Sequence, residues 1–370
     1  MAHVLRSSDL PALAAGCALF GAGGGGATWP VELMVRRGAP WPVTLHDVAD
    51  VDPATPCMAV AYSGSPELLG ERLPSLDPFG IATDAVERWV GTEIPALCSM
   101  EIGGMNGLTT LGAAAGRTLV DADLMGRAFP GFDQVSLLVD GVPGVVLGCA
   151  TGADGVAVVS QARPADVERL LRTAITTAGG WAGIVLGGFT VGDLARHAVL
   201  GAYERVLSVG RGFADARFGE PHDVARAIGG TFLAEGRVQR APQATPHAGV
   251  TSVDLRAVDG AVVRLVARTE LLAVLRDGVV VAAAPTVVAA VDAVTREVVQ
   301  ISELTPGRNV FVLALPAPAW WRAADHRLAA VTPSHFGVEG LDLATDPGTD
   351  PATDPATDPA GTSTDTREAT

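Results

Sequence analysis

The chain of 370 residues is long enough for two domains of ordinary size. It is 48% apolar and only 18% charged, which predicts a large buried core rather than a disordered chain. The formal net charge of −15 argues against a nucleic-acid-binding protein. All 26 basic residues are arginines, so neither a lysine Schiff base with pyridoxal phosphate nor a Walker A phosphate loop can form.

The cysteines and the apolar runs indicate the expected compartment. The four cysteines form no C-x-x-C pair, so neither a zinc knuckle nor a thioredoxin-like motif is predicted, and free buried thiols are expected. The most apolar long run, residues 279–291, is too short for a transmembrane helix and contains Pro285. The apolar run after Asp9 fits a helix better than a signal peptide. We therefore expect a cytoplasmic protein that binds no membrane.

The first half of the chain alternates predicted strands with predicted helices. A helix capped by Ser7, Ser8 or Asp9, with Pro11 in its first turn, is expected to end at the glycines of residues 21–26. Further helices are predicted over 30–38, 84–94, 106–116 and 164–180, and strands over 41–51, 57–64, 95–104, 117–126, 136–141, 144–152 and 154–161. This alternation predicts an α/β N-terminal domain with a mainly parallel sheet.

From about residue 182 the pattern changes. One long helix is predicted, with an apolar stripe through Leu194, Ala198, Val199, Ala202, Val206 and Val209. Short β-rich runs separated by Gly, Pro and Asp turns follow, which predicts a β-rich C-terminal domain. The chain ends in a Thr-Asp-Pro repeat without large apolar residues, a composition typical of a disordered acidic tail. We therefore divide the chain into domains at 1–168 and 169–342 and a tail at 343–370.

The stretch GAGGGG, residues 21–26, matches the dinucleotide-binding pattern G-x-G-x-x-G in spacing only. That site needs a strand before the glycines, and a helical pattern precedes them here. Two interpretations remain: a helix stop with close backbone packing, or a loop whose backbone N–H groups hold an anion or polar ligand. Because consecutive glycines cost conformational entropy on folding, we favour a ligand-binding loop. Its residues are Gly23, Gly24, Gly25 and Gly26.

Two acids follow one another at the end of the predicted strand 117–126. Asp121 and Asp123 lie on one face of this strand, at its carboxyl end, where α/β sheets bind ligands. Two close carboxylates could form an acid/base pair or hold a divalent metal, and Arg127 could neutralise one of them. A structural role also remains open, in which Asp121 caps a loop and Asp123 pairs with Arg127.

A similar group of polar residues follows the strand before it. Glu101 and Asn106 bracket a turn that contains Gly103 and Gly104. An acid and an amide around two glycines suit the close approach of a substrate. They suit an Asn-assisted helix start equally well. We include these four residues in the candidate site.

Metal and nucleophile motifs are scarce. No histidine pair has H-x-H or H-x-x-x-H spacing, and no G-x-S-x-G elbow indicates a serine hydrolase. His335 suits proton transfer or substrate binding, although a lone histidine in a turn is more often structural. A divalent metal held by carboxylates has no strict motif to support it. The sequence therefore requires no cofactor.

Several motifs, taken together, resemble one known family. FGAGGGG, EIGGMNGL and VDADLMGRAFP in the first half, and GGFTVGDL, RTELLAV and TPSHFG in the second, are similar to the S-methyl thiohydantoin desulfurase family, over roughly residues 5–340. The resemblance implies an α/β N-terminal domain and a β-rich C-terminal domain. It also implies chemistry on a five-membered hydantoin-like ring, in which water replaces a methylthio group and methanethiol leaves.

The resemblance also bears on particular residues. Glu270 matches the acid of an Asn-Glu-Asn-type run in the family, and we assign it, with His335, to substrate binding. The chain departs from the family at Thr269, within that run, and at Thr286, where members usually carry an acid after the proline.

Two functions are therefore considered. The first, which we favour, is a hydrolase acting on a hydantoin-like or S-methyl thiohydantoin-like ring, with Asp121, Asp123 and Glu101 as acid/base residues. Hydrogen bonds to the ring would come from the glycine loop, Asn106 or Arg127, in one pocket shared with the two aspartates. The second is a non-catalytic accessory subunit of a hydantoinase-type complex, with those acids in salt bridges and a broad apolar patch on the β-rich domain. A homo-oligomer is expected only because oligomers are common.

Overall fold

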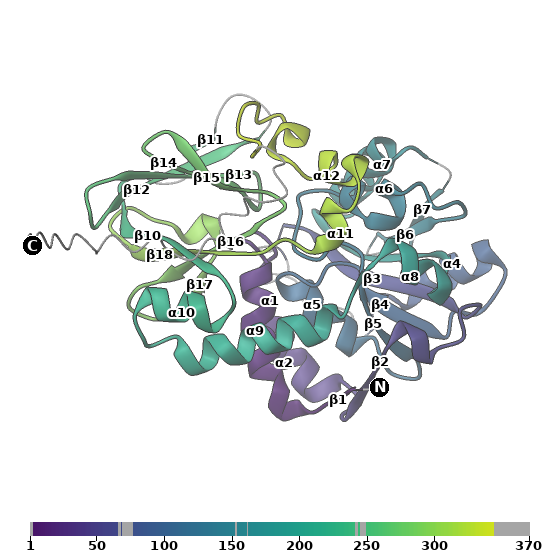
Figure 1. Cartoon of the computed structure of the whole chain (residues 1–370). Coiled ribbons are helices and arrows are strands. Elements are labelled where there is room, and N and C mark those ends of the chain that lie inside the picture. Colours follow the sequence, from purple (N-terminus) through teal and green to yellow (C-terminus); the bar gives the residue numbers. More distant parts are fainter. Residues whose placement is uncertain are drawn as a thin grey trace, which may run out of the picture.

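The computed structural model describes residues 3–65, 68, 77–151, 154–160, 162–240, 243–244 and 249–343. Within these residues the strands form two sheets of nine strands each, which lie at opposite ends of the molecule (Figure 1). No helix in this part of the chain is long and apolar enough to cross a membrane. The Thr-Asp-Pro repeat, predicted to be disordered, lies outside the described residues.

The first sheet is mixed, with strand order β1-β2-β5-β4-β3-β8-β6-β7 and β9 paired with β5. Its strands are β1 (His3–Leu5), β2 (Val43–His46), β3 (Pro56–Gly64), β4 (Ala96–Ser99), β5 (Thr118–Asp123), β6 (Val146–Ala150), β7 (Val156–Ser160), β8 (Trp181–Thr190) and β9 (Val199–Leu200). The pairs β2–β5, β5–β4 and β4–β3 are parallel, and the other pairs are antiparallel.

The predicted α/β domain is confirmed, and its parallel part is confined to the centre of the sheet. There α4 (Gly80–Val90) and α5 (Met105–Gly112) connect β3 to β4 and β4 to β5, as parallel neighbours require. In contrast, β6 and β7 are joined by the short segment 151–155, which cannot cross over the sheet, so they pair antiparallel.

Helices cover both faces of the first sheet, because residues of a strand alternate between its faces. In β3, Met58, Val60 and Tyr62 share one core with α4, α5, α1 (Leu10–Phe20), α2 (Trp29–Gly38) and α9 (Ala202–Ala216). Cys57, Ala59 and Ala61 share the other core with α6 (Ser136–Val139), α7 (Pro164–Thr177) and α8 (Val191–His197). The result is a three-layer N-terminal domain.

Two predicted elements were wrong. Residues 136–141, predicted as a strand, form the short helix α6, because a brief apolar run does not distinguish a buried helix from a buried strand. The long helix predicted across residues 194–209 is two helices, α8 and α9, separated by β9. Gly201, with a φ of 67°, turns the chain between β9 and α9.

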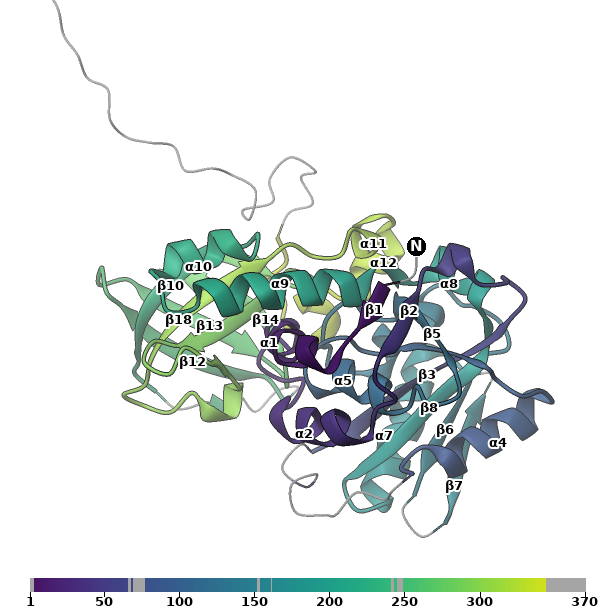
Figure 2. The same ribbon diagram turned by 90° about the horizontal axis from the view of Figure 1, so that it is seen from below.

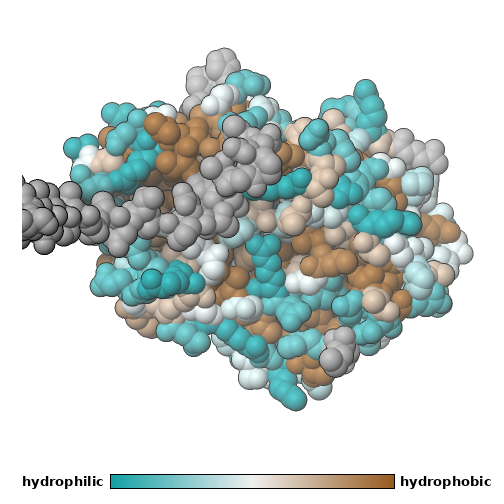
Figure 3. Space-filling view, viewed as in Figure 1, coloured by the Kyte–Doolittle hydropathy of each residue, from teal (hydrophilic) through white to brown (hydrophobic). Residues whose placement is uncertain are grey.

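The second sheet is antiparallel and confirms the predicted β-rich domain. Its order is β15-β14-β13-β12-β10-β18-β16-β17, with β11 paired with β12. Its strands are β10 (Thr231–Val238), β11 (Gln243–Ala244), β12 (Thr251–Ala257), β13 (Val262–Ala267), β14 (Leu271–Arg276), β15 (Val279–Ala283), β16 (Val287–Asp292), β17 (Val298–Val299) and β18 (Asn309–Leu315). Hydrophobic residues gather on the surface over β14 and β15 (Figure 3).

The two sheets are joined through α1 and α9, which pack on each other between them (Figure 2). Val287, Ala289 and Val291 of β16 face the core that contains these helices, and the alternate residues of β16 face the core of the second sheet. The helix α10 (Pro221–Ala227) packs on α9, and α11 (Ala319–Arg322) and α12 (Asp325–Ala329) return the chain to the N-terminal domain.

The first sheet also extends past the division that we placed at residue 168. That position lies inside α7, and the next strand, β8, pairs with β3 and β6 of the first sheet. The last strand of this sheet, β9, ends at Leu200.

Candidate functional site

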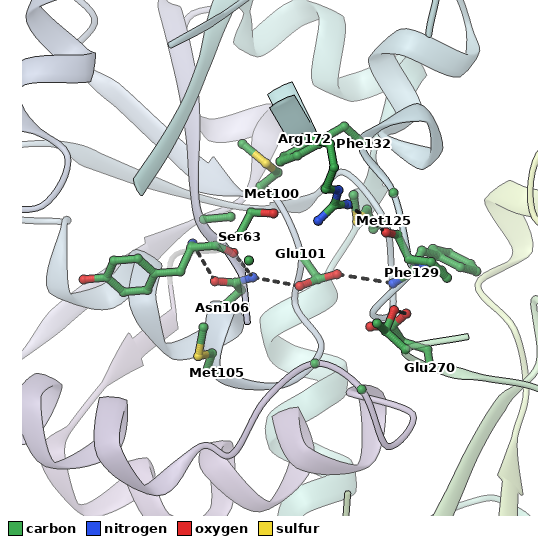
Figure 4. A pocket seen from close by; sticks show the side chains of 18 residues that line it. Ser63, Met100, Glu101, Met105, Asn106, Met125, Phe129, Phe132, Arg172 and Glu270 are labelled. Carbon is green, nitrogen blue, oxygen red and sulfur yellow. Dashed lines mark hydrogen bonds between the residues drawn. The ribbon is translucent and has the colours of Figure 1, made fainter. Parts of the chain in front are cut away.

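A small cavity of about 110 Å³ lies at the carboxyl ends of β3, β4 and β5. This is the edge at which parallel strands bind ligands. The glycine loop, the loop after β5 and the segment before β14 complete its walls (Figure 4). Of the residues that the sequence singled out, it brings together Gly24, Gly25, Glu101, Asn106 and Glu270.

Glu101 is held at both oxygens. The Asn106 side-chain amide donates to Oε2 at 2.8 Å, and the Phe129 backbone N–H donates to Oε1 at 3.2 Å (Figure 4). Asn106 is itself fixed to the end of β3, because Oδ1 accepts from the Tyr62 N–H at 2.8 Å and Nδ2 donates to the Tyr62 carbonyl at 3.0 Å. Asn106 therefore positions Glu101 rather than offering free donors to a ligand.

The electrostatics of the cavity favour a protonated Glu101. Burial, followed by the nearby Glu270 carboxylate, raises the pKa of Glu101 to about 8, against the opposing hydrogen bonds from Asn106 and Phe129. Burial also raises the pKa of Glu270, while the Thr269 hydroxyl, which donates to it at 2.5 Å, and the charge of Arg127 lower it. Two coupled carboxyls in different hydrogen-bonding environments are a common arrangement for acid/base catalysis.

Arg127 lies behind the cavity and does not line it. Its guanidinium is fully buried and donates to three backbone carbonyls: Ala128 at 3.0 Å, Leu271 at 2.8 Å and Thr286 at 2.6 Å. Burial lowers the pKa of Arg127 to about 10, and the acids Glu270 and Glu101 oppose this shift, so the group stays charged at neutral pH. Arg127 thus connects the two domains and places a positive charge near both glutamates.

Asp121 and Asp123 lie outside the cavity. Asp121 accepts from the backbone N–H groups of Tyr203 at 2.7 Å and Glu204 at 3.3 Å, so it caps the first turn of α9 from a distant strand. Burial raises its pKa, and these two hydrogen bonds oppose the shift.

Asp123 is fully buried and accepts from the N–H groups of Met125 and Gly126 in the turn after β5. Burial raises its pKa to about 6, and the Gly126 hydrogen bond opposes this. Neither aspartate has an ion-pair partner among the described residues, so the expected pairing of Asp123 with Arg127 does not occur there. Both carboxylates are used to hold backbone.

The glycine loop brings three backbone segments close together. A Cβ at Gly24 would overlap the Thr269 carbonyl oxygen, and one at Gly103 would overlap the Phe20 carbonyl oxygen. Gly104, with a φ of 67°, donates its N–H to the Cys17 carbonyl at 2.6 Å. Gly103 and Gly104 therefore support the cavity from behind without lining it.

The N–H groups of the loop are only partly available to a ligand. Those of Gly24 and Gly25 both donate to the Gly21 carbonyl, at 2.9 and 3.0 Å. Gly23 accepts from the Ile301 N–H at 2.8 Å, and neither Gly23 nor Gly26 lines the cavity. These contacts support close backbone packing, the interpretation that we favoured less, with two glycines still forming the cavity wall.

His335 borders a neighbouring cavity of about 430 Å³ that shares Pro130, Gly131, Arg172 and Thr269 with the first. Its Nε2 lies 3.1 Å from the Asp133 carboxylate and 3.1 Å from the Gln134 side-chain nitrogen. No cluster of three or more metal-ligating side chains occurs in the described part of the chain. All four cysteines are free and buried.

Sequence reasoning missed the residues that support Glu101. Phe129 acts through its backbone N–H, and such a contact cannot be recognised from the residue type. Phe129 does lie within the motif VDADLMGRAFP. Tyr62 likewise acts through its backbone, and Arg172 reaches the cavity from α7, where the sequence resembles any exposed helix.

Comparisons with known proteins agree with this architecture. A crystal structure of a protein from Chromobacterium violaceum has the same fold, with a TM-score of 0.76 and 21% sequence identity, over 92% of this chain and 98% of that chain. No curated protein matches the chain significantly. A family model described as S-Me-THD-like, N-terminal domain, matches residues 8–161, and one described as S-Me-THD-like, C-terminal domain, matches residues 162–345. The resemblance found in the sequence motifs is confirmed, and the chain belongs to the S-Me-THD-like family.

Proposed function

We propose that this protein is a hydrolase acting on a hydantoin-like or S-methyl thiohydantoin-like five-membered ring, with Glu101 and Glu270 as its acid/base pair. The observation that carries the proposal is a pair of carboxyls with raised pKa values that line one small cavity. Neither carboxyl has an ion-pair partner within the described residues. Membership of the S-Me-THD-like family supports a thiohydantoin-related role.

The size of the cavity supports a small substrate. Its volume of about 110 Å³ is below the roughly 300–1,000 Å³ typical of sites for drug-sized ligands. Apolar side chains from Met100, Met105, Met125 and Phe129 surround the polar groups. Such a cavity suits a flat ring with a few polar edges, because the ring faces pack on apolar groups while the carboxyls meet the ring nitrogens.

In the proposed hydrolysis, the oxygen of a water molecule bonds to the ring carbon that carries the methylthio group. The Glu270 carboxylate takes a proton from that water, and protonated Glu101 gives its proton to the adjacent ring nitrogen. The carbon–sulfur bond then breaks, and Glu270 returns its proton to sulfur as methanethiol leaves. The proton of the new hydroxyl passes to Glu101, so a ring carbonyl forms and both carboxyls return to their starting states.

The test is turnover of an S-methyl thiohydantoin, measured by release of methanethiol and by the mass of the ring product. We expect Glu101→Gln and Glu270→Gln each to lower kcat by about 10²–10⁴, the usual contribution of one acid or base. Asp121→Asn is the matched control and should keep its rate, because Asp121 lies outside the cavity. Full activity in Glu101→Gln would refute the acid/base assignment.

The alternative of a non-catalytic accessory subunit rests on the apolar surface over β14 and β15 (Figure 3). In β15, an edge strand of the second sheet, Val279 is 67% exposed. Edge strands with exposed apolar residues can pair with another chain. Two results together would support this alternative. No hydantoin or thiohydantoin would be turned over, and the protein would co-purify with a hydantoinase-type enzyme that binds β15.

A further inference from the structure

A second cavity, of about 490 Å³, lies between α2, α5, β3 and the start of α4. Its walls are mostly apolar and include Met34 and Val35 of α2, Val60 of β3 and Phe79 before α4. The cavity opens at the surface, because Met34, Gly112 and Ala115 in its wall are exposed, and its volume is in the range of roughly 300–1,000 Å³ that is common for small-molecule sites. Among the described residues, Tyr62 is the one that lines both this cavity and the cavity that contains Glu101.

Two residues with hydroxyl groups, Tyr62 and Thr83, line this mostly apolar cavity. Tyr62 is 5% exposed and Thr83 is 4% exposed. Small-molecule sites typically combine apolar walls with a few polar groups that orient the ligand, and these two hydroxyls can take that role. Burial and the nearby Asp77 carboxylate raise the pKa of Tyr62, so its hydroxyl remains a neutral donor.

The other features of the cavity define the class of ligand. The Tyr62 ring packs on the Phe79 and Trp181 rings, each with a centroid distance of 5.1 Å, and so offers an aromatic surface. Asp77 and Arg117 also line the cavity, and their opposite charges favour neither an anion nor a cation. A neutral, largely apolar molecule therefore fits better than a charged one.

We infer that this second cavity binds an uncharged aromatic molecule whose single hydrogen-bonding group meets the hydroxyls of Tyr62 and Thr83. The site is separate from the Glu101 cavity, and the inference does not depend on the proposed hydrolase activity. A ligand here contacts Tyr62, whose backbone is bonded twice to Asn106, the residue that positions Glu101.

The experiment is ¹⁹F NMR on the full chain labelled with 3-fluorotyrosine. The chain has only two tyrosines, so two resonances are expected. Tyr203 is fully buried and donates to the Gly107 carbonyl at 2.8 Å, which makes it an internal reference. Titration with p-cresol should shift the Tyr62 resonance with saturation and leave the Tyr203 resonance in place.

Gly112→Leu should block the site. A Cβ at Gly112 would lie 3.6 Å from Val35 Cγ2, an ordinary contact, so a larger side chain can enter the cavity without a backbone clash. We expect Gly112→Leu to weaken p-cresol binding at least about tenfold, Gly112→Ala to change it little, and Thr83→Val to weaken it by roughly fivefold through loss of one hydrogen bond.

The Tyr203 resonance shows whether each variant is folded. Should Gly112→Leu fail to fold, Ala115→Phe repeats the test at an exposed residue of the same cavity. Two results would overturn the inference. One is a Tyr62 resonance whose shift does not saturate with p-cresol, and the other is an unchanged p-cresol titration in a folded Gly112→Leu or Ala115→Phe variant.

Discussion

At the scale of single residues, Glu101 combines a raised pKa with fixed geometry. Its pKa of about 8 lies above the ordinary value of 4.5 because of burial and the neighbouring Glu270. If Glu101 acts as the acid, the active enzyme is the form with Glu101 protonated. We therefore expect kcat to fall as the pH rises through about 8, measured by methanethiol release between about pH 6 and pH 9.5. A rate that rises through this range would contradict the role of Glu101 as the acid.

The same pKa shift predicts how stability depends on pH. Between about pH 4.5 and pH 8 the folded state binds a proton at Glu101 that the unfolded state has lost, so the free energy of unfolding falls as the pH rises through this range. Glu101→Gln removes this contribution. Urea unfolding at about pH 5, 7 and 9 should show the wild type losing stability relative to Glu101→Gln as the pH rises. A difference that is constant with pH would mean that the pKa of Glu101 is not raised.

Asp121 is predicted to matter for stability and not for turnover. Its two carboxylate oxygens cap α9 by accepting from the N–H groups of Tyr203 and Glu204. In Asp121→Asn only one side-chain oxygen remains to accept a hydrogen bond. We therefore expect the free energy of unfolding to fall by about 0.5–2 kcal/mol, the usual contribution of a helix cap. Chemical unfolding measures the loss. A large fall in kcat in a folded Asp121→Asn variant would restore the catalytic role that the sequence alone suggested.

At the scale of elements, the glycine loop allows the backbones of the two domains to pack directly against each other. Gly24→Ala places a methyl group against the Thr269 carbonyl oxygen. We therefore expect the free energy of unfolding to fall by at least about 1–3 kcal/mol, as it does in overpacked cores. Gly38→Ala is the matched control, because Gly38 ends α2, is exposed, and a Cβ added there would meet no atom within 4 Å. Thermal unfolding should separate the two variants, and equal melting temperatures would contradict the close packing of the loop.

Elements also differ in how far local pattern determines them. The helices α1 and α2 were predicted from a first-turn proline and a glycine near the end, which are signals within the helix itself. The break between α8 and α9 was not predicted, because the apolar stripe through Val199 and Ala202 is continuous. What interrupts the helix is the pairing of β9 with β5, a strand far earlier in the chain.

At the scale of the whole molecule, Arg127 links the two domains. Arg127→Met leaves the carbonyls of Leu271 and Thr286 without a donor, and each unpaired buried group costs about 1–3 kcal/mol. We expect Arg127→Met to lower the free energy of unfolding, measured in urea, by at least about 2 kcal/mol. Arg211→Met, which removes an exposed ion pair with Asp9, should cost no more than about 1 kcal/mol. An Arg127→Met variant as stable as Arg211→Met would contradict this role.

The sequence by itself determined the two-domain class and the family, and it predicted a candidate site at the carboxyl ends of the central strands. The domain class and the predicted site follow from local signals: alternation of strands with helices, glycine-rich turns, and polar residues placed where strands end. The family follows from the resemblance of several motifs taken together. Glu101 and Asn106 were identified from the local signals and Glu270 through the family resemblance, and the structure brings all three to one cavity.

Only the tertiary structure decided which acids line the cavity. Asp121 and Asp123 satisfy every local criterion for a site, yet both oxygens of Asp121 hold α9 and Oδ2 of Asp123 holds the turn after β5. Which groups an acid meets depends on contacts between segments far apart in the chain. Residue type and spacing record that an acid is present, but its partners, burial and pKa arise only when those segments pack together.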